Sequence, residues 1–371
     1  MTDVLFEELP TAGAHRVGVA TLHAPAALNA LSLPMVRALL SRLRRWATDP
    51  GVACVVLQGA GEKAFCAGGD LRELYESMRA TPGEPSAYAR GFFGEEYELD
   101  YLIHTFEKPI LCWGHGIVMG GGIGLMAGAS HRVVTSQSRL AMPEITVGLY
   151  PDVGGSWILG RMPGRVGLFL ALTGAPLNAA DALFCGLADV HVAASSRADV
   201  IAAIQAAAWT GDAREDHAAL SRVLERAQAR DLPPSNVRAH FDRLNELMAG
   251  DLLAIGARLE SLASDDPWLA TAAATFRKGS PTSAALSFEL RRRTRHASLA
   301  EVFRLEYDVS LGCAAHHDFA EGIRALLIDK DKKPRWAPAA LDAVTSELVE
   351  DHFRPRYAGN HPLVALGNES E

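Results

Sequence analysis

Short β-branched runs alternate with helical patterns through about the first 190 residues, and this alternation constrains the fold more than any other feature of the sequence. Four runs have the composition of strands, namely Val17–Leu22, Cys54–Leu57, Ile110–Trp113 and Arg132–Thr135. Helices that separate strands in this way are typical of α/β proteins. The sequence therefore predicts an α/β core.

The helical patterns have recognisable beginnings and apolar faces. Ser32 is expected to cap a helix, because a serine side chain at that place accepts a hydrogen bond from an amide of the first turn. The residues on the apolar face of this helix are Met35, Val36, Leu39, Leu40, Leu43 and Trp46. A second helix is predicted from Phe92 to Phe106.

After about residue 195 the composition shifts to Ala, Leu and charged residues with helical spacing. We therefore predict a core over residues 1–195, a helical C-terminal region over 196–353 and a tail over 354–371. The tail contains Pro, Gly and Asn, and such a composition at a chain end is typical of partial disorder.

Composition argues against several classes of protein. The 36 Lys and Arg against 44 Asp and Glu give a net charge of −8, which is unsuited to binding nucleic acid. No run of about 18 apolar residues occurs, so no membrane span is expected. The five cysteines are widely spaced without a CxxC pair, and the start lacks the pattern of an export signal. These features predict a cytoplasmic protein with reduced thiols and no metal site.

Two glycine-rich segments, Lys63–Leu74 and His115–Arg132, lie where a predicted strand runs into a predicted helix. Glycine lets the backbone approach a ligand closely, and free amides at such junctions can donate to an oxygen that gains negative charge. The alternative is that these glycines only form tight turns and close helix contacts. The two segments are thus candidates for an oxyanion hole.

The second segment also satisfies a dinucleotide-binding pattern, with Gly122, Gly124 and Ala127 followed by Glu144 about twenty residues later. This match is weak, because Glu144 follows Pro143 instead of ending a clean strand. About a hundred residues also precede the supposed first strand–helix turn.

The motifs KAFCAGGD, MGGGIGL, AMPEITVGLYPDVGGS and LTGAPLNAADALFCGLAD resemble, in this order, those of the crotonase (enoyl-CoA hydratase/isomerase) superfamily. FFGEEYELD, KGSPTS and HHDFAEGIRALLIDKDKKPRW make the chain most similar to the 3-hydroxyisobutyryl-CoA hydrolase branch. The resemblance extends from about Ala27 to Trp336. It implies a crotonase-like spiral of ββα turns followed by a helical C-terminal region.

The resemblance also implies roles for individual residues. The amides of Gly69 and Gly121 correspond to the oxyanion donors, and Glu96, Glu144 and Asp152 correspond to active-site acids. In hydratases, one glutamate follows the glycine triplet by two residues and a second lies in the PE pair, and both act on the added water. Here the first position is Gly124 and the second is Glu144, while Asp152 stands where hydratases usually have glycine. This departure favours hydrolysis over hydration.

Each acid has a structural alternative. Glu144 is a candidate base or nucleophile with a pKa raised by apolar neighbours, or a helix or turn cap. Asp152 is a candidate hydrogen-bond partner of the substrate's hydroxyl or acyl end, or a turn residue. Glu96 is a candidate pocket residue, or part of a solvated helix face with Glu95.

Other polar residues carry weaker expectations. Asp70 is expected to cap a helix, and His316 and His317 to be structural or surface residues. The lysines most suited to the phosphates of coenzyme A are Lys63, Lys278, Lys330, Lys332 and Lys333.

The resemblance implies an acyl-CoA thioester hydrolase of the 3-hydroxyisobutyryl-CoA type, as expected in valine breakdown. No metal or redox cofactor is implied, because coenzyme A is part of the substrate, and a homo-oligomer could form through the helical region. The alternatives are an enoyl-CoA hydratase or isomerase, and a non-catalytic protein that binds acyl-CoA.

Overall fold

The computed structural model describes residues 3–368. Contacts group the chain into two compact units, each assembled from three segments. The sheet unit contains the residues up to Gly69, Glu98–Leu140 and Leu177–Arg238. The helical unit contains Asp70–Tyr97, Ala141–Pro176 and the residues from Ala239 onward. The division predicted near residue 195 is based on composition. The contacts do not test it, so it stays a prediction.

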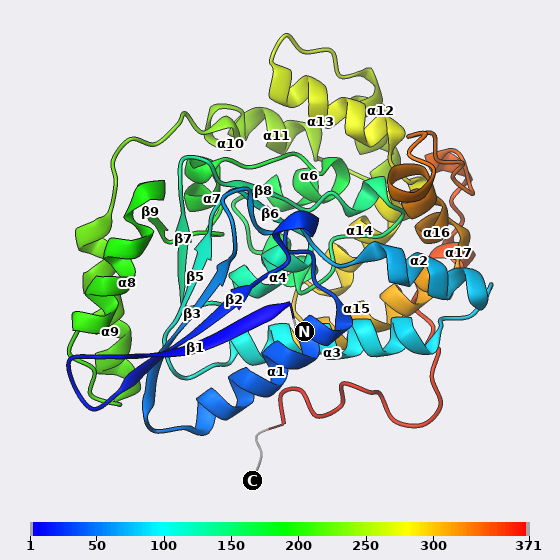
Figure 1. Cartoon of the computed structure of the whole chain (residues 1–371). Helices are drawn as coiled ribbons and strands as arrows, with labels where there is room; N and C mark the ends of the chain where they lie inside the picture. The colour runs from blue at the N-terminus through cyan, green and yellow to red at the C-terminus, as the bar shows by residue number, and fades with distance from the viewer. Residues whose placement is uncertain (1–2, 369–371) are drawn as a thin grey trace. The chain divides into compact units, whose positions relative to one another are not determined.

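The sheet unit contains a six-stranded sheet with the order β1-β2-β3-β5-β7-β9 (Figure 1). Its strands are β1 (Val4–Pro10), β2 (Arg16–Leu22), β3 (Val52–Gly59), β5 (Ile110–Gly114), β7 (His131–Val134) and β9 (Val190–His191). β1 pairs antiparallel with β2, and each later pair is parallel. The four strands predicted from sequence are confirmed as β2, β3, β5 and β7. A second sheet has the order β4-β6-β8, with strands β4 (Ala64–Cys66), β6 (Ile117–Met119) and β8 (Arg139–Ala141).

The two faces of strand β2 contact different helices. Val17 and Val19 lie in the apolar cluster that also contains Val200 of α8 (Arg197–Ala206) and Leu220 of α9 (Ala213–Ala227). Figure 1 shows these two helices side by side along the large sheet. Gly18 points the other way, since side chains alternate along a strand, and a Cβ there would lie 2.8 Å from the indole of Trp46. Glycine at this position lets the helix that carries Trp46 pack closely on the strand.

That helix is α1 (Leu33–Thr48), and it begins where the sequence predicts. The Ser32 hydroxyl accepts a hydrogen bond from the Met35 amide at 3.4 Å, and the predicted apolar face is buried. The second predicted helix is α3 (Ala87–His104). The sheet unit also contains α4 (Gly121–Ala127) and α7 (Ala179–Phe184), and α10 (Asn236–Ala239) lies at its last boundary.

The helical unit is built around α15 (Leu299–Ala315), which is buried on most of its surface. Its N-terminus carries a capping box formed by Ser298 and Glu301. α15 packs against α5 (Gly155–Gly160), α16 (His317–Ile323) and α17 (Ser346–His352). The unit's other helices are α2 (Leu71–Ala80), the part of α3 up to Tyr97, α6 (Val166–Thr173), α11 (Phe241–Leu247), α12 (Leu252–Ser261), α13 (Pro267–Lys278) and α14 (Pro281–Arg293).

Regular structure after His191 is helical throughout the described residues, as the composition predicts. In the tail, Leu363 and Leu366 are buried, and Arg304 donates a hydrogen bond to the Leu366 carbonyl at 2.8 Å. Residues 369–371 of the predicted tail lie outside the described residues.

Among the helices that the structure describes, none is long and apolar enough to cross a membrane.

Candidate active site

The described part of the helical unit contains several buried carboxyl groups without an ion-pair partner, and four of them are Asp152 and the three acids whose pKa its charge influences. The exposed fractions are 2% for Glu96, 6% for Glu144, 5% for Asp152 and 0% for Glu306. Within the described residues, none of the four forms an ion pair. Burying a carboxylate without a cation is unfavourable, so the neutral form gains stability and the pKa rises. Such a cluster can hold and release protons near neutral pH.

Glu144 lies at the start of a 3₁₀ turn, η2 (Glu144–Thr146). Its backbone carbonyl accepts hydrogen bonds from Val147 and Leu149, but Pro143 is the cap residue and no side chain caps the turn. In the described structure, Oε2 of Glu144 is buried without a hydrogen-bond partner. Burial, and then the charge of Asp152, raise the pKa of Glu144 well above its ordinary value. The apolar setting expected from Ala141, Met142, Ile145 and Val147 is confirmed by their burial.

Asp152 lies in a tight turn between η2 and α5. The hydroxyl of Tyr97 donates a hydrogen bond to its Oδ2 at 2.7 Å, while its backbone carbonyl accepts from the Gly155 amide at 2.6 Å. Burial raises the pKa of Asp152 to about 6, although the Tyr97 hydrogen bond lowers it. Asp152 is therefore a turn residue by its backbone and a member of the acid cluster by its side chain.

Glu306 of α15 holds this turn in place, and sequence reasoning missed it. Its Oε2 accepts from the Gly154 amide at 2.7 Å, and its Oε1 accepts from the Ser156 amide at 2.8 Å. The turn needs such support, because Val153 and Gly154 both have left-handed φ angles, of +52° and +80°. Burial raises the pKa of Glu306 to about 8. The sequence carried one signal for Glu306: it is a lone acid, three residues after Phe303, on an otherwise apolar helix face.

Glu96 lies on the buried side of α3, so the side chain does not belong to a solvated face. Its Oε1 has no hydrogen-bond partner among the described residues. Burial, and then the charge of Asp152, raise the pKa of Glu96 well above its ordinary value. Asp152 thus influences both glutamates, and the structure brings the three predicted acids into one electrostatically coupled cluster.

The two glycine segments meet within the sheet unit. Gly68 has a φ of +107°, and a Cβ there would lie 3.4 Å from the Met119 carbonyl oxygen and 3.9 Å from the Gly121 nitrogen. Outside the regular helices and strands of the described chain, neither the Gly69 nor the Gly121 amide donates a hydrogen bond. The oxyanion role expected for these two amides stays a prediction. For Gly122 the structure supports the other interpretation of these glycines, close packing, because a Cβ there would lie 2.4 Å from the Cys66 carbonyl oxygen.

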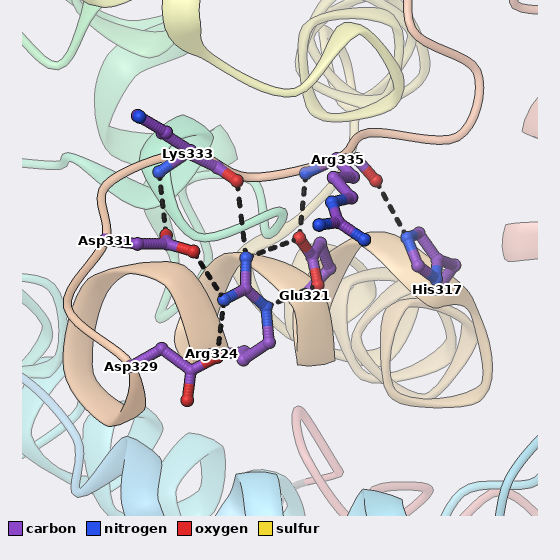
Figure 2. Close-up of polar contacts among 7 residues, drawn as sticks. All are labelled: His317, Glu321, Arg324, Asp329, Asp331, Lys333 and Arg335. Atoms are coloured by element: carbon purple, nitrogen blue, oxygen red, sulfur yellow. Dashed lines mark hydrogen bonds and ion pairs between the residues drawn. The ribbon is translucent and has the colours of Figure 1, made fainter.

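An exposed charged segment of the helical unit, which we call the basic strap, extends from Asp329 to Trp336 (Figure 2). Arg324 forms a bidentate pair with Glu321 at 2.8 Å for each bond, and also donates to Asp329 at 2.6 Å and Asp331 at 2.8 Å. Asp331 in turn accepts from the Lys333 amide at 2.9 Å. Both acids of the strap are thus paired with Arg324, which they share with Glu321.

The lysines of the strap remain unpaired. Lys330, Lys332 and Lys333 are exposed, and none of them forms an ion pair with another described residue. Lys330 and Lys332 have left-handed φ angles of +57° and +55°. The other two candidate lysines, Lys63 and Lys278, are also exposed.

Hydrogen bonds connect Ala337, the residue directly after the strap, to the turn of Glu144. The Ala337 amide donates to Asp318 Oδ1 at 2.8 Å, and the Ser280 hydroxyl donates to Asp318 Oδ2 at 2.6 Å. The Ser280 amide then donates to the Ile145 carbonyl at 2.9 Å. The strap and η2 are therefore joined through two side chains of the helical unit.

The remaining expectations concern caps and histidines. Asp70 caps α2 by accepting from the Arg72 amide at 3.1 Å, as predicted. His317 bonds the Arg335 carbonyl at 2.8 Å, and His316 stacks on His352 with ring centroids 3.8 Å apart. These contacts fit the structural interpretation of both histidines. No group of three or more His, Cys, Asp or Glu side chains in the described residues is arranged to hold a metal ion.

Comparison with known proteins identifies the family to which this chain belongs. Residues 17–353 match the model of the enoyl-CoA hydratase/isomerase family, and the chain belongs to this family. A 3-hydroxyisobutyryl-CoA hydrolase, mitochondrial, from Gallus gallus is 37% identical over 348 residues, covering 93% of this chain and 88% of that protein. The Homo sapiens protein of the same name is 37% identical, with 91% and 86% covered.

Two solved structures with similar sequence identity to this chain have other names than the curated relatives. The crystal structure of an enoyl-CoA hydratase from Rhodobacter sphaeroides 2.4.1 has a TM-score of 0.83 at 38% identity, covering 95% of this chain and 97% of that one. A carnitinyl-CoA dehydratase from Mycobacterium thermoresistibile also has a TM-score of 0.83 at 38% identity, with 96% and 97% covered. The α/β, crotonase-like fold expected from the sequence is confirmed by these two structures.

Proposed function

We propose that this protein hydrolyses acyl-CoA thioesters, with 3-hydroxyisobutyryl-CoA as its substrate. The observation that carries the proposal is Glu144, whose buried carboxyl has an oxygen without a partner among the described residues and a pKa raised by burial and by Asp152. The first acid of the hydratase pattern, the glutamate two residues after the glycine triplet, is absent, because its position is Gly124. The names of the curated relatives support the same reaction.

Glu144 can act in two ways, and both require its ionised form. As a general base it accepts a proton from the water that attacks the thioester carbonyl, and the coenzyme A thiolate then leaves. As a nucleophile it attacks the carbonyl itself, giving a mixed anhydride and the thiolate, and water then cleaves the anhydride. A raised pKa makes the carboxylate a stronger proton acceptor once it has lost its proton.

The amides of Gly69 and Gly121 are proposed to stabilise the oxyanion that forms when the thioester carbonyl is attacked. Outside the regular helices and strands of the described residues, neither amide donates to a backbone carbonyl, and this supports the role. A single amide donor that meets a developing oxyanion contributes roughly 3 to 4 kcal/mol to the transition state. Asp152 is proposed to recognise the hydroxyl or acyl end of the substrate, and Glu96 to contribute to the substrate pocket.

The lysines of the basic strap are proposed to bind the phosphates of coenzyme A. Three of the five candidate lysines lie here, and Arg324 offsets part of the competing negative charge of Asp329 and Asp331. An exposed lysine pairs with a phosphate as a point charge, so each contact contributes modestly and is screened by salt.

The experiment that tests the proposal is an assay of purified protein with 3-hydroxyisobutyryl-CoA and crotonyl-CoA. Hydrolysis releases a free thiol from the first substrate, and Glu144→Gln serves as the matched control. Hydration would change the enoyl absorbance of crotonyl-CoA without releasing thiol, and the names of the two solved relatives make it the second candidate function. A protein that only binds acyl-CoA would give neither signal.

The cellular setting is proposed separately. All five cysteines are buried and free, which suits a reducing compartment, and the sequence-based proposal is the cytoplasm. The names of the curated relatives place those proteins in mitochondria, so fractionation of cells against markers of both compartments is the test.

Two further proposals are participation in valine breakdown and a homo-oligomer formed through the helical region. Light scattering tests the oligomer.

A further inference from the structure

A chain of four short oxygen–oxygen contacts begins at Asp152 and ends at a backbone carbonyl of α15. Asp152 Oδ2 lies 2.7 Å from Tyr97 Oη, which lies 2.6 Å from Ser310 Oγ. Ser310 Oγ lies 2.8 Å from Tyr150 Oη, which lies 2.6 Å from the Glu306 carbonyl oxygen. All five residues are buried within the helical unit. Each contact has the length of a hydrogen bond between oxygens, and each therefore needs one hydrogen.

The three hydroxyl groups supply three hydrogens for these four contacts. The last contact uses the hydrogen of Tyr150, because a carbonyl oxygen only accepts. If Asp152 is ionised, the first contact uses the hydrogen of Tyr97. The single hydrogen of Ser310 would then have to serve both of its contacts, leaving two buried oxygens within 2.8 Å of each other without a hydrogen between them.

A proton on Asp152 removes this shortage. Asp152 then donates to Tyr97, Tyr97 to Ser310, Ser310 to Tyr150, and Tyr150 to the Glu306 carbonyl. All four contacts carry a hydrogen, and all four point in the same direction. Buried polar groups are normally satisfied, so the arrangement with a complete set of hydrogens is the favoured one.

We propose that Asp152 is held as a neutral carboxylic acid in the free enzyme, and that Ser310 is the positioning residue that keeps it so by accepting the hydrogen of Tyr97. The surroundings agree with a neutral group. The titratable groups that interact with Asp152 are Glu96 and Tyr97 on α3, Glu144 on η2, Tyr150 on the turn, and Glu306 and Cys313 on α15. None of these groups is a cation.

The direction in which burial shifts the pKa of Asp152 agrees with the hydrogen count. Burial raises it to about 6 even when Tyr97 donates to the carboxylate and thereby lowers it. When the direction of this hydrogen bond reverses, the lowering contribution is lost and the neutral form is favoured further.

A neutral Asp152 also affects the ionisation of Glu144, and the significance of this effect rests on the proposed function. The charge of Asp152 is the second cause of the raised pKa of Glu144. A proton on Asp152 removes that repulsion, so Glu144 ionises more readily and becomes available as base or nucleophile. Ser310, which needs no contact with the substrate, thereby tunes the group proposed to react.

The test is a pH titration of protein labelled with [4-¹³C]aspartate, followed by NMR, with the Asp152 resonance assigned by its loss in Asp152→Asn. In Ser310→Ala the hydrogen of Tyr97 can go only to Asp152, so the ionised form gains and the pKa of Asp152 should fall by roughly 0.5 to 1 pH unit. Ser310→Thr keeps the hydroxyl and is the matched control, with a pKa near that of the wild type.

An unchanged or higher Asp152 pKa in Ser310→Ala would overturn the proposal. That result is expected if Ser310 merely donates to Tyr97 and strengthens its bond to an ionised Asp152. Infrared spectra of the labelled wild-type protein at neutral pH give an independent measurement if Ser310→Ala fails to fold. They should show the carbonyl band of a protonated aspartic acid that disappears in Asp152→Asn, and the lack of such a band would equally overturn the proposal.

A kinetic readout separates this inference from the proposed function. In Ser310→Ala, the ionised Asp152 repels the Glu144 carboxylate, so the rise of kcat/KM with pH should shift to higher pH. If no thioester is hydrolysed by any of these proteins, the proposed function fails, but the titration of Asp152 still decides the proton count.

Discussion

The buried acids around Glu144 and the acids around Arg324 are the same chemical groups in opposite environments. Burial raises the pKa of Glu96, Glu144 and Asp152, which have no cation beside them. Hydrogen bonds from Arg324 lower the pKa of Glu321 and Asp331 (Figure 2). Carboxylates that meet a cation therefore hold a segment in place, whereas carboxyls buried without one remain able to exchange protons. We expect substitutions in the two regions to differ in the same way.

The largest expected effect is that of Glu144→Gln on hydrolysis. The amide keeps the shape of the side chain but accepts no proton, so kcat should fall by roughly 10²- to 10⁴-fold, and by more if Glu144 is the nucleophile. Thiol release from 3-hydroxyisobutyryl-CoA measures this, with Glu321→Gln in the cation-paired group as the control. The expected activity of the control is within a few fold of wild type. Comparable losses in both variants would remove the distinction between the two regions.

Two neighbouring glycines should separate a chemical role from a packing role. In Gly121→Val, a side chain beside the proposed oxyanion donor should reduce kcat by roughly 10²- to 10³-fold and leave the thermal midpoint nearly unchanged. In Gly122→Ala, the added Cβ would lie 2.4 Å from the Cys66 carbonyl oxygen, so the protein should lose roughly 1 to 3 kcal/mol of stability. Thermal melts and the thiol assay on both variants test this, and a fully active Gly121→Val would place the oxyanion hole elsewhere.

The strap should affect binding without affecting chemistry. Replacing Lys330, Lys332 and Lys333 together by Gln should raise KM for the acyl-CoA roughly tenfold, with kcat within about twofold, because three weak phosphate contacts are lost. The same substitutions should leave KM for a pantetheine thioester unchanged, since it lacks the nucleotide phosphates. An equal increase for both substrates would mean that the lysines act on the fold instead of the phosphates.

The smallest expected effect concerns stability and pH. The pKa of Glu306 is about 8 in the folded protein against an ordinary value of 4.5, so its contribution to stability is present at low pH and is lost as the pH rises to about 8. The slope is at most about 1.4 kcal/mol per pH unit for one proton. Between about pH 6.5 and 8, the unfolding free energy of Glu306→Gln should therefore fall less with pH than that of wild type.

Urea titrations at several pH values measure this slope. Histidines with lowered pKa values, such as His104 and His131 at about 4, add an opposing slope near pH 6.5, where the unfolded chain still binds their protons, but this contribution is the same in wild type and variant. Glu321→Gln is the matched control and should keep the wild-type slope, because the pKa of Glu321 is lowered. An identical slope in Glu306→Gln would show that Glu306 is already ionised at pH 6.5.

Much of the sheet unit could be predicted from sequence, because its strands have clear composition and its first helix a clear cap. The strands of the second sheet have three residues each and β9 has two, which is too short for a periodic pattern. The grouping into units could not be predicted either. Segments 70–97 and 141–176 belong to the helical unit through contacts with residues far along the chain, and composition does not record such contacts.

The site was predictable where a motif or a local environment carried the signal. The apolar neighbours of Glu144 indicated a raised pKa, and the resemblance indicated Asp152 and Glu96. The hydroxyl chain was not predictable, because Tyr97 and Ser310 are 213 positions apart in sequence and a serine on an apolar helix face carries no motif. Glu306 was missed because its one signal, a lone acid on an otherwise apolar helix face, belongs to no motif.

The most direct test of the central claim is the pH dependence of kcat/KM for 3-hydroxyisobutyryl-CoA in wild type and Glu144→Gln. Glu144 must be ionised to react, so the wild-type rate should rise with pH through an apparent pKa well above the ordinary value of 4.5, as the burial of this carboxyl requires. That apparent pKa belongs to the coupled acid cluster as a whole. Residual hydrolysis by Glu144→Gln should lack this rise. A wild-type rate that is flat between pH 5 and 9, or a Glu144→Gln profile that keeps the same rise, would contradict the assignment of the reaction to Glu144.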